Sequence, residues 1–215
     1  MTVTAKICGI NDAASMRAAV DNGAGFVGYV FYPQSPRSVS PGTAVQLAAM
    51  TPEGVTKVGL FVDPDNLLLS HVLSEVPLDI LQLHGDETPT RCEEIRERFE
   101  LPVMKAIKVA KIEDIEYAND YVHVVDWLMF DAKAPQSLPG ALPGGNAQAF
   151  DWTLLAGWVW PVPWMLAGGL NADNVATAVS RSGARVVDVS SGVESAPDKK
   201  DPAEIHRFLE AVAEI

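Results

Sequence analysis

Cysteine and basic residues are both scarce in this sequence. Its 2 cysteines, Cys8 and Cys92, lack the regular spacing of a disulfide framework or a zinc site. This usage fits a reducing cytosol, so we expect a cytoplasmic protein. Lysine and arginine number 16 against 28 aspartates and glutamates, which gives a net charge of −12. The chain therefore lacks the basic footprint that nucleic-acid binding usually leaves, and we expect no nucleic-acid partner.

Long apolar runs are also missing. No stretch reaches the roughly 18–20 apolar residues that a membrane span needs, so we expect no membrane partner. The N-terminus has no basic region followed by a long apolar stretch, so we expect no signal peptide. Linkers, repeats and low-complexity segments are absent as well. Hydrophobic residues still make up 48% of the 215 residues, enough for a core, and we expect one domain over residues 1–215.

What the chain does have is a regular alternation of apolar, strand-like runs and helical segments. The expected strands are residues 4–8, 26–31, 55–62, 79–83, 102–107, 128–131, 164–167 and 186–189. Helices are expected between them, with caps at Asn11-Asp12, Ser40 and Asn171, although the short acidic segment 111–119 makes helix five weak or missing. This order predicts an α/β fold, a single (β/α)8 TIM barrel. An open doubly wound sheet is the competing architecture, but no G-x-G-x-x-G follows the first strand.

Two reactive side chains stand at carboxyl ends of expected strands, where barrel enzymes place their active sites. Cys8 is either a small buried hydrophobe or a catalytic thiol. Asp131 is either a cap for the following loop or a functional acid. Together they would supply one base and one acid at the same mouth. Lys6 shares the face of Cys8, because strand side chains alternate; it either lowers the thiol pKa or forms an ion pair in the barrel.

Two turns of small residues follow the last two expected strands. Gly168 and Gly169 come after the seventh, and Ser190, Ser191 and Gly192 come after the eighth. Small residues let the backbone approach a ligand, and these two loops of a barrel frequently build a phosphate site. Either turn alone could be a tight turn that merely needs glycine. Both together favour a phosphate ligand.

Other polar residues are candidates for the same mouth. Arg37 lies in a proline-bounded loop, where it is either solvated or holds a carboxylate in a bidentate pair. His84 follows the fourth strand and is either a surface residue or part of the mouth. Cys92 is expected to be structural. The remaining histidines show no metal-ligand spacing, so we expect no metal.

Several segments together resemble the phosphoribosylanthranilate isomerases of tryptophan biosynthesis. The similarity extends from residue 6 to about residue 201 and is carried by Lys6-Ile7-Cys8-Gly9, Phe31-Tyr32-Pro33-Gln34-Ser35-Pro36-Arg37, Leu81-Gln82-Leu83-His84-Gly85 and Asp188-Val189-Ser190-Ser191-Gly192-Val193-Glu194. The resemblance implies an Amadori rearrangement of a phosphorylated sugar joined to anthranilate. It implies no cofactor, because the imine intermediate accepts the electrons. The expected assembly is a monomer or a homodimer.

The resemblance also implies roles for the candidate residues. Cys8 would be the general base and Asp131 the general acid, while Arg37 would hold the anthranilate carboxylate. The two small-residue turns would hold the phosphate, and the other expected substrate-binding residues are Lys6, His84 and Asp188. Two positions depart from the family pattern, Ala147 in the glycine-rich loop and Asp198 where glycine is usual. Neither departure removes a proposed catalytic group.

Three alternatives remain open. An isomerase of the histidine-pathway aminoaldose performs a similar reaction, but its base on the first strand is an aspartate, where this chain has Cys8. An enzyme that accepts both substrates is a second alternative. A non-catalytic barrel that binds a phosphorylated sugar is the third; it would keep the glycine turns and lose the acid or the base.

Overall fold

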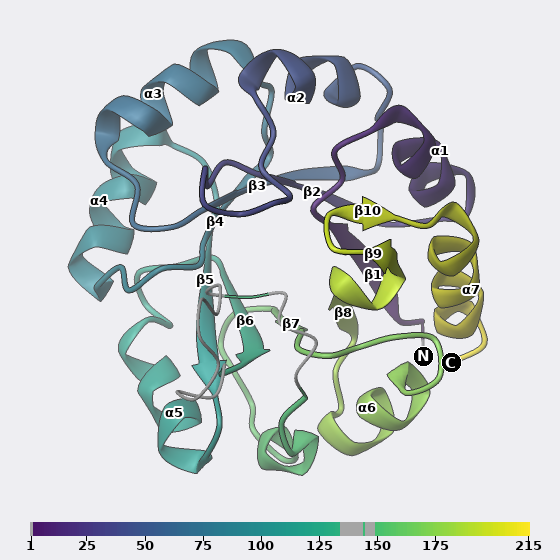
Figure 1. Cartoon of the computed structure of the whole chain (residues 1–215). Coiled ribbons are helices and arrows are strands. Elements are labelled where there is room, and N and C mark those ends of the chain that lie inside the picture. Colours follow the sequence, from purple (N-terminus) through teal and green to yellow (C-terminus); the bar gives the residue numbers. More distant parts are fainter. Residues whose placement is uncertain (1, 134–143, 145–148) are drawn as a thin grey trace.

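A closed barrel of parallel strands forms the centre of the molecule, with helices around it (Figure 1). The computed structural model describes residues 2–133, 144 and 149–215. Each strand pairs in parallel with the next, and the last strand pairs with the first. The barrel strands are β1 (Thr4–Cys8), β2 (Phe26–Val30), β3 (Thr56–Phe61), β4 (Ile80–Leu83), β5 (Val103–Val109), β6 (Trp127–Ala132), β7 (Trp164–Leu166) and β8 (Val186–Val189). The (β/α)8 prediction is confirmed.

The outer helices follow the strands in turn. They are α1 (Ala13–Asp21), α2 (Pro41–Ala48), α3 (Asn66–Glu75), α4 (Pro89–Phe99), α5 (Ile112–Glu116), α6 (Val175–Ser182) and α7 (Pro202–Ala213). Short 3-10 turns are η1 (Tyr117–Asp120), η2 (Trp152–Leu155) and η3 (Ser191–Val193), and a small hairpin is made by β9 (Glu194–Ala196) and β10 (Lys199–Lys200). No helix in the described part of the chain is long and apolar enough to cross a membrane.

The weak fifth helix is present in shortened form. α5 has 5 residues and continues directly into η1. Between β6 and β7 the only helical element among the described residues is η2. The Asp151 side chain caps it by accepting a hydrogen bond from the backbone N–H of Thr153. The expected loop 132–150 falls largely outside the described residues, and Ala147 lies outside them.

Helix caps explain where several helices begin. The Asp12 carboxylate accepts the N–H groups of Ala14 and Ser15, and the Ser40 hydroxyl accepts that of Thr43, as expected. The expectation for Asn171 needs correction. Its side chain accepts the N–H groups of the two residues before α6, so it caps the turn that precedes the helix.

Two apolar layers stabilise the barrel. The larger layer lies between strands and helices, and a smaller one fills the barrel interior with Val58, Ile80, Met104, Ala106, Met129, Met165 and Ala167. Alternation along β1 sends Ile7 to the outer layer and Lys6 and Cys8 inward. Above the interior layer the side chains turn polar, and this is where the mouth of the barrel begins.

The β9–β10 hairpin was not foreseen from the sequence. Figure 1 shows it over the barrel opening beside β1. Asp198, in the turn between the two strands, has φ 63°, a left-handed conformation that suits glycine better than other residues. Its carbonyl accepts a hydrogen bond from Asn11 at 3.0 Å, which ties the hairpin to the loop after β1. A glycine would adopt this conformation at a lower cost than Asp198 does.

Candidate active site

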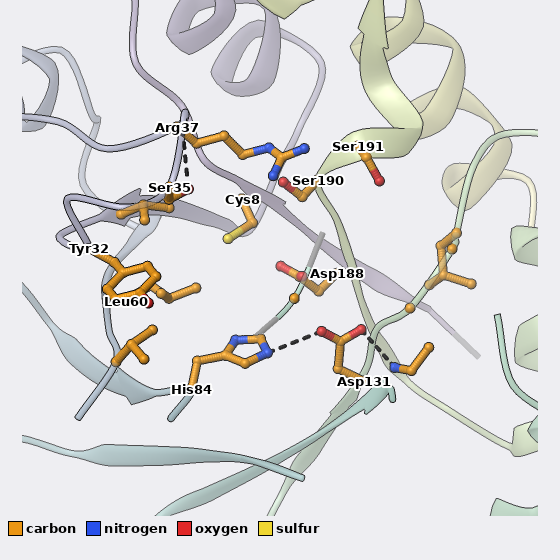
Figure 2. Close-up of a pocket in the computed structure, with 17 residues that line it drawn as sticks. Cys8, Tyr32, Ser35, Arg37, Leu60, His84, Asp131, Asp188, Ser190 and Ser191 are labelled. Carbon is orange, nitrogen blue, oxygen red and sulfur yellow. Dashed lines mark hydrogen bonds and ion pairs between the residues drawn. The ribbon is translucent and has the colours of Figure 1, made fainter. Parts of the chain in front are cut away.

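A pocket lies at the carboxyl ends of the strands (Figure 2). Most of the residues predicted from the sequence line it: Cys8, Arg37, His84, Asp131, Gly168, Gly169, Asp188, Ser190 and Ser191. Lys6 and Gly192 do not belong to the lining. Lys6 pairs with Asp188, and Gly192 lies against the carbonyl of Leu170; both of these partners line the pocket. The sequence therefore predicted the location of the pocket and most of its polar lining.

Cys8 ends β1 and projects into the pocket (Figure 2). Its side chain is buried, and burial raises the pKa of the thiol above its ordinary value. Lys6 and Lys200 act in the opposite direction, because a nearby cation favours the thiolate, while Asp188 adds to the rise. The thiol of Cys8 is therefore protonated at neutral pH in the free protein.

Lys6 forms the barrel ion pair that was one of its two expected roles. Its Nζ lies 2.7 Å from Asp188 Oδ1, and the lysine side chain is fully buried. Burial works against the charged amine, but Asp188 and Cys8 outweigh it, so the pKa of Lys6 is raised. A permanent positive charge therefore lies below Cys8. It reduces the rise in the thiol pKa without reversing it.

Asp131 is held in place on both carboxylate oxygens. The backbone N–H of Ala132 donates to Oδ1 at 2.8 Å, and His84 Nε2 lies 3.1 Å from Oδ2. The amide Nε2 of Gln82 lies 3.0 Å from His84 Nδ1. If this amide donates to Nδ1, the histidine proton is on Nε2 and is donated to Asp131. Gln82 belongs to the motif Leu81-Gln82-Leu83-His84-Gly85, but the sequence alone predicts no role for it.

The two small-residue turns pack tightly against their neighbours. Gly168 has φ 89° and Gly169 has φ 64°, and a Cβ on Gly168 would stand 2.6 Å from the backbone N of Ala132. A Cβ on Gly192 would collide with the carbonyl oxygen of Leu170. Only glycine therefore fits at these two positions. The close packing brings the loops after β7 and β8 together at one side of the pocket.

Three charged side chains form a network at the edge of the pocket. Arg37 donates to Glu194 through Nε at 2.7 Å and through Nη2 at 2.9 Å. Lys200 Nζ donates to Glu194 Oε1 at 2.6 Å and to the Ser190 carbonyl at 2.9 Å. Sequence reasoning assigned no role to Glu194 or Lys200. Glu194 belongs to a motif that was recognised, whereas nothing local in the sequence marks Lys200.

The pKa values of this network reflect burial and pairing. Burial alone would raise the pKa of Glu194, but Arg37 and Lys200 outweigh it and the pKa is lowered. Burial lowers the pKa of Lys200, against the attraction of Glu194. Glu194 is therefore ionised at neutral pH.

Cys92 lies far from this chemistry, on α4. It is fully buried, and burial raises the pKa of its thiol to about 12. It behaves as a packing residue, as expected. Within the described part of the chain no group of three or more His, Cys, Asp or Glu side chains is placed to hold a metal ion.

Comparisons with known proteins identify the family to which this chain belongs. Residues 5–211 match the family model described as N-(5'-phosphoribosyl)anthranilate (PRA) isomerase. Curated relatives include the N-(5'-phosphoribosyl)anthranilate isomerase of Rhodospirillum centenum, 55% identical over 213 residues and covering 99% of both chains. That of Paracoccus denitrificans is 56% identical over 209 residues, covering 97% of this chain and 96% of its own.

Solved structures give the same result. The phosphoribosyl anthranilate isomerase of Thermotoga maritima is 36% identical with a TM-score of 0.88, over 100% of both chains. A phosphoribosyl anthranilate isomerase in complex with reduced 1-(o-carboxyphenylamino)-1-deoxyribulose 5-phosphate is 34% identical with a TM-score of 0.84, over 100% of both chains. The fold, the pocket and these relatives agree: this chain belongs to the N-(5'-phosphoribosyl)anthranilate isomerase family.

Proposed function

We propose that this protein converts N-(5'-phosphoribosyl)anthranilate into 1-(2-carboxyphenylamino)-1-deoxyribulose 5-phosphate, with Asp131 as general acid and Cys8 as general base. The observation that carries the proposal is the shared pocket. A thiol and a carboxyl line it together with the two turns suited to a phosphate. An Amadori rearrangement needs one proton donated to the ring oxygen and one proton removed from C2, the two sugar atoms bonded to C1.

The first step is ring opening. Asp131 donates a proton to the furanose ring oxygen, and the bond between that oxygen and C1 breaks. The lone pair of the anthranilate nitrogen forms the C1–N double bond, which gives a protonated Schiff base. His84 and the N–H of Ala132 support this role because they hold the two oxygens of Asp131 in one orientation.

The second step is proton removal. Cys8, as thiolate, takes the proton from C2, and the electrons of that bond move to form the C1–C2 double bond while the nitrogen becomes neutral. The enolamine then tautomerises to the ketone. The protonated imine accepts the electrons, so neither a metal ion nor a cofactor is required. Lys6 and Lys200 help the thiolate to form, because both favour the charged state of Cys8.

Substrate binding uses two groups of residues in the pocket. Gly168, Gly169 and the Ser190–Gly192 turn hold the phosphate through backbone N–H groups, which suit an anion where the chain comes close. Arg37, from the loop after β2, binds the anthranilate carboxylate. Asp188, which lines the pocket, contacts the sugar, and its pairing with Lys6 fixes its orientation.

The proposal also covers the cellular compartment and the assembly of the enzyme. It acts in the cytoplasm, where free thiols such as Cys8 stay reduced. It is a monomer or a homodimer; one solved relative from Thermotoga maritima is described as dimeric, with monomers generated from it. Sedimentation velocity at several concentrations distinguishes the two assemblies.

Fluorescence of freshly formed N-(5'-phosphoribosyl)anthranilate tests the proposal. The wild-type protein is expected to make the signal decay much faster than in buffer, while Cys8→Ser and Asp131→Asn leave it at the buffer rate. A wild-type protein that leaves the decay unchanged would contradict the activity. The histidine-pathway aminoaldose is then the next substrate to test. If the protein does not convert that substrate either, the remaining alternative is a non-catalytic barrel that binds a phosphorylated sugar.

A further inference from the structure

Arg37, Glu194 and Lys200 come from two separate parts of the chain. Arg37 lies in the loop after β2, whereas Glu194 begins β9 and Lys200 ends β10. The hairpin therefore brings a carboxylate and a second cation to the arginine. Glu194 Oε1 accepts from both Arg37 Nε at 2.7 Å and Lys200 Nζ at 2.6 Å. One carboxylate thus links the two cations.

The charge balance of this triad matters because it is buried. The side chains are exposed by only 8% for Arg37, 4% for Glu194 and 0% for Lys200. Charges removed from water interact more strongly than charges on the surface. Arg37 and Glu194 alone would form a neutral pair, and Glu194 would repel a carboxylate bound nearby. Lys200 restores one net positive charge to the group.

We propose that Lys200 is a positioning and specificity-determining residue for the substrate carboxylate, because it offsets Glu194 and so leaves Arg37 able to attract that carboxylate. This inference rests on the proposed function, in which Arg37 binds the carboxylate. In this arrangement Glu194 orients the guanidinium, and Lys200 removes the electrostatic cost of that orientation.

Lys200 has a second set of contacts that the test must separate. Its Nζ also donates to the Ser190 carbonyl at 2.9 Å and lies 3.3 Å from the Ser190 hydroxyl. A merely structural lysine would hold the phosphate turn, and its loss would weaken every phosphorylated ligand equally. The proposed electrostatic role affects only ligands that carry the carboxylate.

The experiment uses two probes that differ in one group. One is reduced 1-(o-carboxyphenylamino)-1-deoxyribulose 5-phosphate, and the other is its phenylamino counterpart without the carboxyl. Dissociation constants of both are measured by calorimetry at fixed ionic strength. The dissociation constant of the phenylamino probe divided by that of the carboxylated probe gives the preference for the carboxylate. The contribution of the phosphate cancels from this ratio, because both probes carry it.

Lys200→Met is expected to reduce this ratio by about tenfold, the scale of one charge-assisted interaction. Lys199→Met is the matched control, since it removes the same charge from an exposed neighbour on the same strand. It should leave the ratio unchanged. The double variant Glu194→Gln/Lys200→Met removes both charges and leaves that of Arg37, so it should recover most of the ratio. Lys200→Gln repeats the test if Lys200→Met does not fold.

Equal weakening of both probes by Lys200→Met would overturn the inference, as would a double variant no better than the single one. Arg37→Met separates this inference from the proposed function. If Arg37→Met abolishes the preference for the carboxylate while Lys200→Met does not, only the role of Lys200 is wrong. If Arg37→Met also leaves the ratio unchanged, the carboxylate is bound elsewhere and the proposed binding mode fails.

Discussion

His84 Nε2 and Asp131 Oδ2 lie 3.1 Å apart at the mouth of the barrel, and both side chains are buried. The histidine comes directly after β4 and the aspartate lies in β6, so the contact joins two strands that are not neighbours in the sheet. A carboxyl group held in this way keeps one orientation in the pocket. In the proposed mechanism this orientation serves the ring-opening step.

Loss of this contact should slow turnover more than binding. His84→Asn cannot reach Asp131, and we expect kcat to fall between about 10-fold and 100-fold with a small change in KM. His84→Gln places an amide near the position of Nε2 and should recover part of the loss. Steady-state kinetics of both variants, with the exposed His71→Asn as control, provide the check. Equal kcat values for wild type and His84→Asn would show that the contact has no catalytic role.

The direction in which the pKa of Cys8 is shifted can be measured. In the proposed mechanism Cys8 acts as thiolate, and burial raises the thiol pKa above its ordinary value of 9.0. In the free enzyme the thiolate fraction should therefore still increase as the pH rises above 9. Ultraviolet titration of thiolate absorbance in the Cys92→Ser background measures this directly. A midpoint below 9 would mean that the cations around Cys8 dominate over burial.

Cys92 should make the fold sensitive to alkaline pH. Its pKa is raised to about 12 in the fold, so above pH 9 the thiolate forms mainly in the unfolded chain. Each further pH unit then lowers the free energy of unfolding by about 1.4 kcal/mol until the folded thiol titrates. Cys92→Ser has no thiol to titrate at this position. The difference in unfolding free energy between wild type and Cys92→Ser, measured by urea unfolding from pH 8 to 10.5, should therefore shrink as the pH rises above 9. A constant difference would contradict the raised pKa of Cys92.

Glycine at position 168 should be needed for its space as well as its conformation. Gly168→Ala would bring a Cβ against the backbone of Ala132, while Gly183 has φ 76° with nothing within 4 Å of an added Cβ. We expect Gly168→Ala to cost about 3 kcal/mol of unfolding free energy and Gly183→Ala about 1 kcal/mol. Urea unfolding of the two variants tests the difference. Equal costs would show that the loop after β7 can move away.

Strand positions and the pocket followed from local patterns. Residues 4–8 and 186–189 form the strands expected of them, and the rule that active sites lie at carboxyl ends of barrel strands placed Cys8 and Asp131 together. These features depend on short apolar runs and on alternation. Both can be recognised in a sequence without knowing which segments meet in space.

Other parts of the site depend on contacts between distant segments. Lys200 reaches Glu194 only because a hairpin forms, and that hairpin includes Asp198 in a left-handed conformation that its residue type does not favour. Likewise, the ion pair of Lys6 depends on the pairing of β1 with β8 at the closure of the barrel. The barrel predicted from the strand order implies the second pairing, but it does not identify Asp188 as the partner of Lys6. Nothing local in the sequence marks the hairpin, so the network around Arg37 could not be predicted from it.

The most direct test of the central claim follows the hydrogen at C2 of the substrate. Substrate carrying deuterium at C2 is mixed with excess enzyme, and the label in the product is measured by mass spectrometry after a single turnover. Wild type and Cys92→Ser should remove the deuterium, while Cys8→Ser and Asp131→Asn leave the substrate unreacted and labelled. Removal of the label by Cys8→Ser at the wild-type rate would show that Cys8 is not the base.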